Sequence, residues 1–205
     1  MKNLKLSGLL LFLAGSIALM GIITAEAFYP AGYSTRNSEI SDLGSTVQPN
    51  SVIFHPSADI FNATMLTAGL LVLAATFLQH KHLHKLVFSI PLGLFGLGLT
   101  GIGLFPGNMT PYHGIFSLLT FTSGGIAVIS SCKVVAPPFK WVAIAFGAIA
   151  LTTFLSAIFM SKTIFAFIGD GGTERWVAYP ILLWLTGFGG YLMNATTETE
   201  ASSTR

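Results

Sequence analysis

Eight polar side chains lie near the ends of long apolar stretches, where a membrane protein can place a reactive site. They are Glu26, Asp42, His55, Asp59, Asn62, His113, Glu174 and Arg175. Imidazole and carboxylate groups transfer protons during hydrolysis and are common zinc ligands. An arginine can grip a phosphate group through two parallel hydrogen bonds. We therefore expect these residues to form one polar cluster that handles a lipid head group.

The candidate catalytic residues are His113 and Asp42. The concrete hypothesis is hydrolysis or acyl transfer with His113 as general base or metal ligand. Both residues also have structural interpretations. A histidine at a helix start often serves only as a hydrogen-bonding residue. Asp42 lies in the segment 41–44 (S-D-L-G), where aspartate accepts backbone amides in a turn and glycine supplies a positive φ. The sequence leaves open whether the protein is an enzyme.

Five further residues are candidates for ligand binding: Glu26, Asp59, Asn62, Glu174 and Arg175. Asp59 and Asn62 are three residues apart and share a helix face, although an aspartate at a helix start also complements the macrodipole. Glu174 and Arg175 are adjacent, so they do not face each other. Arg175 needs a partner elsewhere, and the candidates are Glu26, Asp42 and Asp59. A buried ion pair between helices is the structural alternative to a grip on a lipid phosphate.

The candidate metal ligands are His55 and His113, which with the nearby carboxylates match the usual ligands of a divalent metal such as zinc. No HExxH or HxxxH spacing occurs among them. A second histidine group lies in the segment 80–85 (HKHLHK). Its alternating histidines could bind metal, but the segment is interpreted as a short basic loop that meets anionic head groups. The single cysteine, Cys132, excludes an intramolecular disulfide and a CxxC motif.

The elements that must position these residues are membrane helices. Of the 205 residues 52% are hydrophobic and 9% are charged, whereas soluble domains carry roughly 25% charged residues. A spanning helix needs about 20 apolar residues, and helices satisfy every backbone amide in hydrocarbon. The sequence predicts an all-α bundle of six transmembrane helices in one domain, residues 1–194, followed by a disordered polar tail, 195–205. The expected spans are 6–28, 59–78, 86–105, 113–132, 139–160 and 176–193.

Basic residues predict the orientation. With the N-terminus inside, seven lie on the cytoplasmic side (Lys2, Lys5, Lys81, Lys85, Lys133, Lys140 and Arg205) and three outside (Arg36, Lys162 and Arg175). Both termini are then cytoplasmic, in the cell membrane, and the long loop between the first two helices lies outside with the polar cluster. The basic residues form no run or stripe, so nucleic-acid binding is not expected. A homo-oligomer is left open.

Several short motifs also carry a resemblance. They are the segment 40–54 (ISDLGSTVQPNSVIF), Asn62, the segment 101–108 (GIGLFPGN) followed by His113 and Gly114, and the segment 171–175 (GGTER). In this order the chain resembles the uncharacterised prokaryotic membrane family of unknown function 998, and more distantly the Frag/DRAM/Sfk six-span proteins. The resemblance implies a six-span bundle with a long first outer loop, and links to lipid-anchor remodelling, lipid asymmetry and autophagy.

Three functions fit these observations. The first is binding or remodelling of lipid, either a head group or a lipid anchor, through the outward polar cluster. The second is a non-catalytic scaffold or regulator in which the cluster is a structural network between helices. The third, a small transporter, has less support because charges at mid-membrane depth are nearly absent and no internal repeat is visible. We favour the first, with membrane lipids as partners.

Overall fold

Six long helices account for the architecture of the computed structural model, which describes residues 2–160 and 166–194. The helices are α1 (Lys2–Ala27), α2 (Ser57–Leu83), α3 (Leu86–Leu104), α4 (Tyr112–Ser130), α5 (Phe139–Phe159) and α6 (Gly169–Met193). Two short 3-10 turns complete the fold: η1 (Ser41–Leu43) lies within the connection between α1 and α2, and η2 (Ser131–Lys133) directly follows α4. The described residues contain no strand. The predicted all-α class and six-helix bundle are confirmed.

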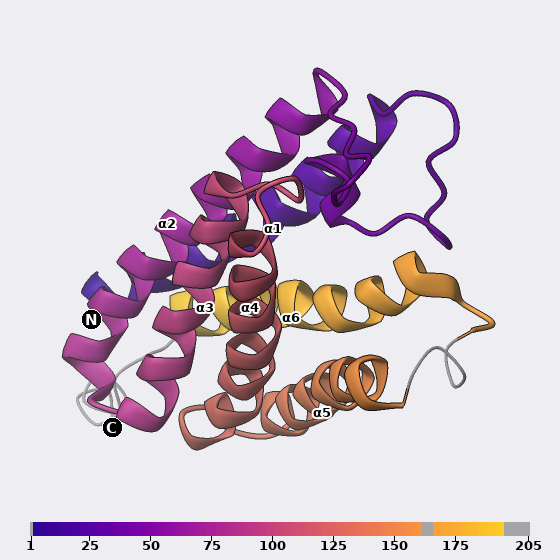
Figure 1. Ribbon diagram of the computed structural model, residues 1–205. Helices are drawn as coiled ribbons and strands as arrows, with labels where there is room; N and C mark the ends of the chain where they lie inside the picture. Colours follow the sequence, from indigo (N-terminus) through magenta and orange to yellow (C-terminus); the bar gives the residue numbers. More distant parts are fainter. Residues whose placement is uncertain (1, 161–165, 195–205) are drawn as a thin grey trace, which may run out of the picture.

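Each helix packs against its neighbour in the chain, and α6 returns to pack against α1 (Figure 1). The glycine Gly8 near the start of α1 lies against Gly189 near the end of α6, so both helices place their chain-terminal ends at one end of the bundle. We call this the terminal end. The opposite end carries the long connection 28–56 and is called the loop end.

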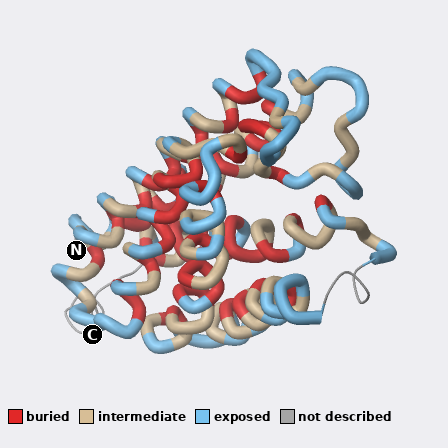
Figure 2. Tube along the Cα trace, in the orientation of Figure 1, coloured by how far each residue is buried: buried red, intermediate tan, exposed pale blue. Residues whose placement is uncertain are grey.

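The apolar side chains point both inward and outward. Alanines, leucines and aromatic residues fill the centre, while many large apolar residues remain on the surface of every helix (Figure 2). Each helix contains an 18-residue stretch with mean hydropathy between 1.2 and 2.3. An exposed apolar belt around six such helices needs lipid as its solvent. The protein is therefore a multi-pass membrane protein.

Glycines let α3 pack closely against both of its neighbours, α2 and α4. A side chain at Gly96 would press on Val72 and Leu73 of α2, and one at Gly98 would collide with Thr120 of α4. Small residues allow this close approach of backbones in membranes, where packing rather than water drives helix association. The tight packing holds the loop ends of α3 and α4 in place.

Two predicted helix boundaries were wrong. Helix α6 begins at Gly169 rather than near Trp176, and α2 continues to Leu83 through most of the segment predicted as a basic loop. His84, in the left-handed conformation with a φ of 50°, ends α2. The predicted tail 195–205 lies outside the described residues.

Candidate functional site

The connection 28–56 packs over the loop end of the bundle. Its apolar Leu43 is fully buried and Ile40 nearly so, and the Ser57 hydroxyl of α2 donates to the Leu43 carbonyl oxygen at 3.2 Å. Among its larger apolar and aromatic side chains, Tyr29 and Tyr33 pack against the core, while Phe28, Val52, Ile53 and Phe54 stay exposed.

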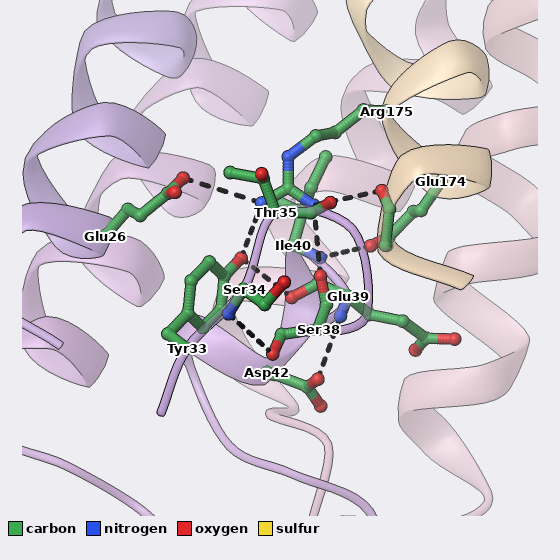
Figure 3. Close-up of polar contacts among 11 residues, drawn as sticks. Glu26, Tyr33, Ser34, Thr35, Ser38, Glu39, Ile40, Asp42, Glu174 and Arg175 are labelled. Atoms are coloured by element: carbon green, nitrogen blue, oxygen red, sulfur yellow. Dashed lines mark hydrogen bonds and ion pairs between the residues drawn. The ribbon is translucent and has the colours of Figure 1, made fainter. Parts of the chain in front are cut away.

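Arg175 ties this connection to α6 (Figure 3). Its Nη1 donates to the carbonyl oxygens of Thr35 and Ser38, both at 3.0 Å, and to that of Gly171 at 2.9 Å. Its Nη2 donates to the Tyr33 hydroxyl at 2.7 Å and reaches a carboxylate oxygen of Glu26 at 3.5 Å. Both terminal nitrogens are thus engaged by protein. Glu26 is the partner that was sought for Arg175 among three carboxylates.

The Tyr33 hydroxyl links Arg175 to a second point in the loop. Its hydroxyl accepts from Arg175 and donates to the Glu39 carbonyl oxygen at 3.0 Å. Burial raises the pKa of Tyr33 above its usual value, against the lowering effect of Arg175. The phenol therefore keeps the proton that its donor role requires.

Glycines at the start of α6 make room for the loop backbone. A side chain at Gly169, whose φ is 74°, would collide with the Arg36 carbonyl oxygen, and one at Gly171 would collide with that of Ser38. The amide of Gly172 donates to the Arg36 oxygen at 3.2 Å. These glycines permit close contact between the loop backbone and the first turn of α6, which begins at Gly169.

Glu174 faces a different direction from Arg175, as expected for adjacent helix residues. One of its carboxylate oxygens accepts a hydrogen bond from the Ile40 amide (Figure 3). The side chain also lines a cavity beside α4 and α5. The two residues therefore have different roles. Arg175 holds the loop to α6, whereas Glu174 forms part of the cavity wall.

His113 lies on the other side of this cavity. It is only 8% exposed, and its Nδ1 lies 2.8 Å from the Phe105 carbonyl oxygen. A carbonyl accepts hydrogen bonds only, so Nδ1 carries the proton. The other ring nitrogen, Nε2, has no hydrogen-bond partner among the described residues. It is available to a molecule in the cavity that the ring lines.

The cavity has a volume of about 750 Å³ and two unlike walls. The polar wall comes from the loop, α4 and α6, and includes Asn37, Glu39, Ser41, His113, Ser117 and Glu174. The apolar wall comes from α4 and α5, and includes Leu118, Phe121, Phe154, Ile158 and Met160. Buried residues in α5 stop at Thr153. The cavity lies beside the last turns of α5, where that helix no longer packs into the bundle.

A smaller pocket of about 50 Å³ lies deeper, in the bundle centre. Ser41, Ser117, Phe121 and Glu174 line both spaces. The remaining walls of the deeper pocket are almost all apolar and include Ile22, Phe61, Phe95 and Leu99. The polar cavity therefore adjoins an apolar recess between the helices.

Asp42 and Asn62 lie behind the polar wall. One Asp42 carboxylate oxygen accepts from the Glu39 amide at 2.9 Å, which is the turn-stabilising role that its sequence context allowed. Burial raises the pKa of Asp42, while the Glu39 amide and His113 act against the rise. The Asn62 side-chain oxygen is buried and has no hydrogen-bond partner within residues 2–160 and 166–194. A side chain at Gly44 would stand 2.6 Å from it.

His55 and Asp59 form a separate, exposed pair. Their Nδ1 and carboxylate oxygen are 2.7 Å apart, with side chains 67% and 65% exposed. Neither residue lines the cavity that holds His113. Within residues 2–160 and 166–194, no three histidine, cysteine or acidic side chains group closely enough to hold a metal ion. The predicted divalent-metal site thus has no ligand group in this part of the chain.

Sequence reasoning did not reveal the roles of Ser117 and Tyr33. Ser117 follows His113 by one helical turn and so shares its face, a signal that i, i+4 spacing could have given. Tyr33 gave no such signal. Its hydroxyl contacts the Glu39 carbonyl oxygen and the guanidinium of Arg175, which is distant in sequence.

Comparison with known proteins gives one match. The family described as "Protein of unknown function (DUF998)" matches residues 12–191, which span all six helices. No curated protein and no solved structure matches the chain. A relation to the Frag/DRAM/Sfk proteins stays an expectation. With the greater part of its length matched, this chain belongs to the uncharacterised family of unknown function 998.

Proposed function

We propose that the protein binds an amphiphilic lipid from the cell membrane, with the polar head group in the 750 Å³ cavity at the loop end. The loop end faces outward and both termini lie in the cytoplasm in this proposal. The distribution of lysine and arginine supports that orientation. The cavity would then lie at the depth where head groups and acyl chains meet.

The observation that carries the proposal is the pairing of the two walls. Carboxylates, hydroxyls and the free Nε2 of His113 offer hydrogen bonds on one side, while Phe121, Phe154 and Ile158 offer an apolar surface on the other. Ligand sites typically combine an apolar lining with a few placed polar groups, in volumes of about 300–1,000 Å³. A molecule with one polar and one apolar part matches this division.

Binding, rather than hydrolysis, is the function that the geometry supports. An activated nucleophile needs a hydroxyl or thiol hydrogen-bonded to its base. In the described part of the chain, the only hydrogen bond of the His113 side chain is the one to the Phe105 carbonyl oxygen. His113 is therefore assigned a contact to the ligand.

A scaffold role is a second candidate, and the contacts of Arg175 favour it for one half of the cluster. Its two terminal nitrogens hold the loop to α6 and leave no free fork for a phosphate. The two candidates make different predictions. Lipid binding requires an open cavity, whereas a scaffold role requires only the hydrogen bonds by which Arg175 holds the loop to α6.

The test fills the cavity without disturbing its walls. A side chain at Gly114, which lines the cavity, would meet no atom within 4 Å. We expect Gly114→Leu to lower co-purified lipid at least about fivefold, because a leucine side chain takes up ligand space, and native mass spectrometry in a mild detergent measures this. Ser117→Leu, between the two spaces, is a second blocking variant.

Gly190→Leu is the matched control. Gly190 is also helical, also has open space around its Cβ position, and lies near the terminal end of α6. Its lipid occupancy should equal that of the wild type. Unchanged occupancy in both blocking variants, with their thermal stability intact, would refute lipid binding in the cavity and leave the scaffold role.

A further inference from the structure

We infer that the lipid bound in this cavity is recognised through hydroxyl groups of its head group, which meet His113 and Ser117 together. This inference rests on the proposed function and names the class of its ligand. Both side chains line the cavity and belong to α4, where they are one helical turn apart. Residues four apart share a helix face, with Cβ atoms about 5–6 Å from each other, so one head group can contact both.

His113 supplies an acceptor. The residue is only 8% exposed, and its Nδ1 donates to the Phe105 carbonyl oxygen at 2.8 Å. In the neutral ring Nε2 therefore carries a lone pair, and no donor reaches that nitrogen within residues 2–160 and 166–194. A ligand hydroxyl satisfies this acceptor, whereas an apolar group in its place would leave it unpaired, at a cost in free energy.

Ser117 supplies a hydroxyl that its own helix does not use. Serine and threonine inside a helix can donate to the carbonyl oxygen four residues earlier. Two residues of α4 do so, since Thr120 donates to Phe116 at 2.7 Å and Ser123 donates to Leu119. The Ser117 hydroxyl makes no such bond and has no other partner in the described part of the chain. A hydroxyl both donates and accepts, so it complements a hydroxyl on the ligand.

Several other polar groups near the cavity are already engaged by protein. The Ser41 hydroxyl donates to a Glu39 carboxylate oxygen at 3.4 Å, and one Glu174 carboxylate oxygen accepts from the Ile40 amide. Both terminal nitrogens of Arg175 are held by the loop and its neighbours. The two available groups of α4 are neutral, so this contact needs no charge on the ligand.

The same face of α4 sets the direction of the lipid. Phe121 follows Ser117 by one further turn, and both residues line the cavity as well as the deeper pocket. Phe95 and Leu99 of α3 form part of the wall of that pocket. Polar groups thus give way to apolar ones along the face, from His113 towards the bundle centre. A hydroxyl-bearing head group with one acyl chain matches this order, and a monoacylglycerol is its simplest form.

The experiment compares three probes with the same acyl chain: a monoacylglycerol, its di-O-methyl ether, and the propyl ester of the fatty acid. Each is titrated against the purified full-length protein in an uncharged maltoside detergent, at about pH 8, where free imidazole is neutral. Native mass spectrometry measures the bound fraction. The ether is larger than the monoacylglycerol and the ester is smaller, so size alone does not weaken both. We expect both to bind about tenfold more weakly, the combined effect of two ordinary hydrogen bonds. Equal or tighter binding of either analogue would overturn the inference.

Two variants locate the contact. Ser117→Ala removes only the hydroxyl, and His113→Asn keeps an N–H donor for the Phe105 carbonyl oxygen while removing the acceptor at Nε2. Each should reduce the preference for the monoacylglycerol over its ether about threefold, because each removes one hydrogen-bonding partner.

Ser123→Ala is the matched control. Its hydroxyl is bonded within α4, and Ser123 lines neither the cavity nor the deeper pocket. This variant should keep the full preference for the monoacylglycerol. An equal loss of preference in the control, or a full preference in both Ser117→Ala and His113→Asn, would refute the assignment of the contact to this face of α4.

The Gly114→Leu variant separates this inference from the proposed function. If it weakens none of the probes and leaves co-purified lipid unchanged, the cavity is not the lipid site, and both the proposed function and the inference fail. If it lowers lipid occupancy but the wild-type protein shows no preference for the monoacylglycerol, or binds none of the probes, only the hydroxyl assignment fails.

Discussion

At the scale of single residues, Arg175 is the side chain whose loss should cost most stability. Its guanidinium is the shared partner of carbonyl oxygens on Thr35 and Ser38 and of the Tyr33 hydroxyl. Hydrogen bonds to a charged group contribute about 1.5–3 kcal/mol each. We expect Arg175→Leu to lower the free energy of unfolding by about 3 kcal/mol or more, measured as the thermal transition in detergent.

The lysine variant separates shape from charge. Arg175→Lys keeps the positive charge but loses the planar fork that serves several acceptors at once, so it should recover only part of the lost stability. Arg36→Lys is the control, because that exposed arginine uses its backbone rather than its guanidinium to meet α6. A stable Arg175→Leu protein that had lost its lipid would instead make Arg175 a binding residue.

At the scale of elements, the first turns of α6 show how a helix start is set by tertiary contact. Gly171 has no room for a methyl group, because the Ser38 carbonyl oxygen of the loop occupies its Cβ position. We expect Gly171→Ala to lower the thermal transition, although alanine is the better helix former by about 1 kcal/mol. Gly190→Ala, where nothing stands within 4 Å, should raise it slightly. A rise for both would show that the loop does not pack on α6.

The same helix shows what sequence can and cannot predict. Long apolar runs predicted all six helices, because hydrocarbon leaves the backbone no alternative. The start of α6 was predicted seven residues late, since a glycine-rich segment reads as a loop until its packing partner is known.

Prediction of the candidate site succeeded only in part, for a similar reason. Helix ends bring Glu26 near Arg175 as expected, because the topology places them at one end of the bundle. The topology does not say which way a loop turns, so His55 was grouped with His113 although it pairs with the exposed Asp59. The cavity itself was not foreseen, because it exists only where α5 stops packing after Thr153.

At the scale of the whole molecule, orientation decides which lipid pool the cavity meets. The distribution of basic residues predicts that the loop end lies outside, and introduced cysteines can test this prediction in a Cys132→Ala background. Val47 is exposed in the loop and His82 is exposed near the end of α2, at the opposite end of the bundle. In intact cells, a membrane-impermeant maleimide should label Val47→Cys at once and His82→Cys only after permeabilisation. The reverse pattern would turn the cavity toward the cytoplasmic leaflet, and the lipid sought for it would have to come from there.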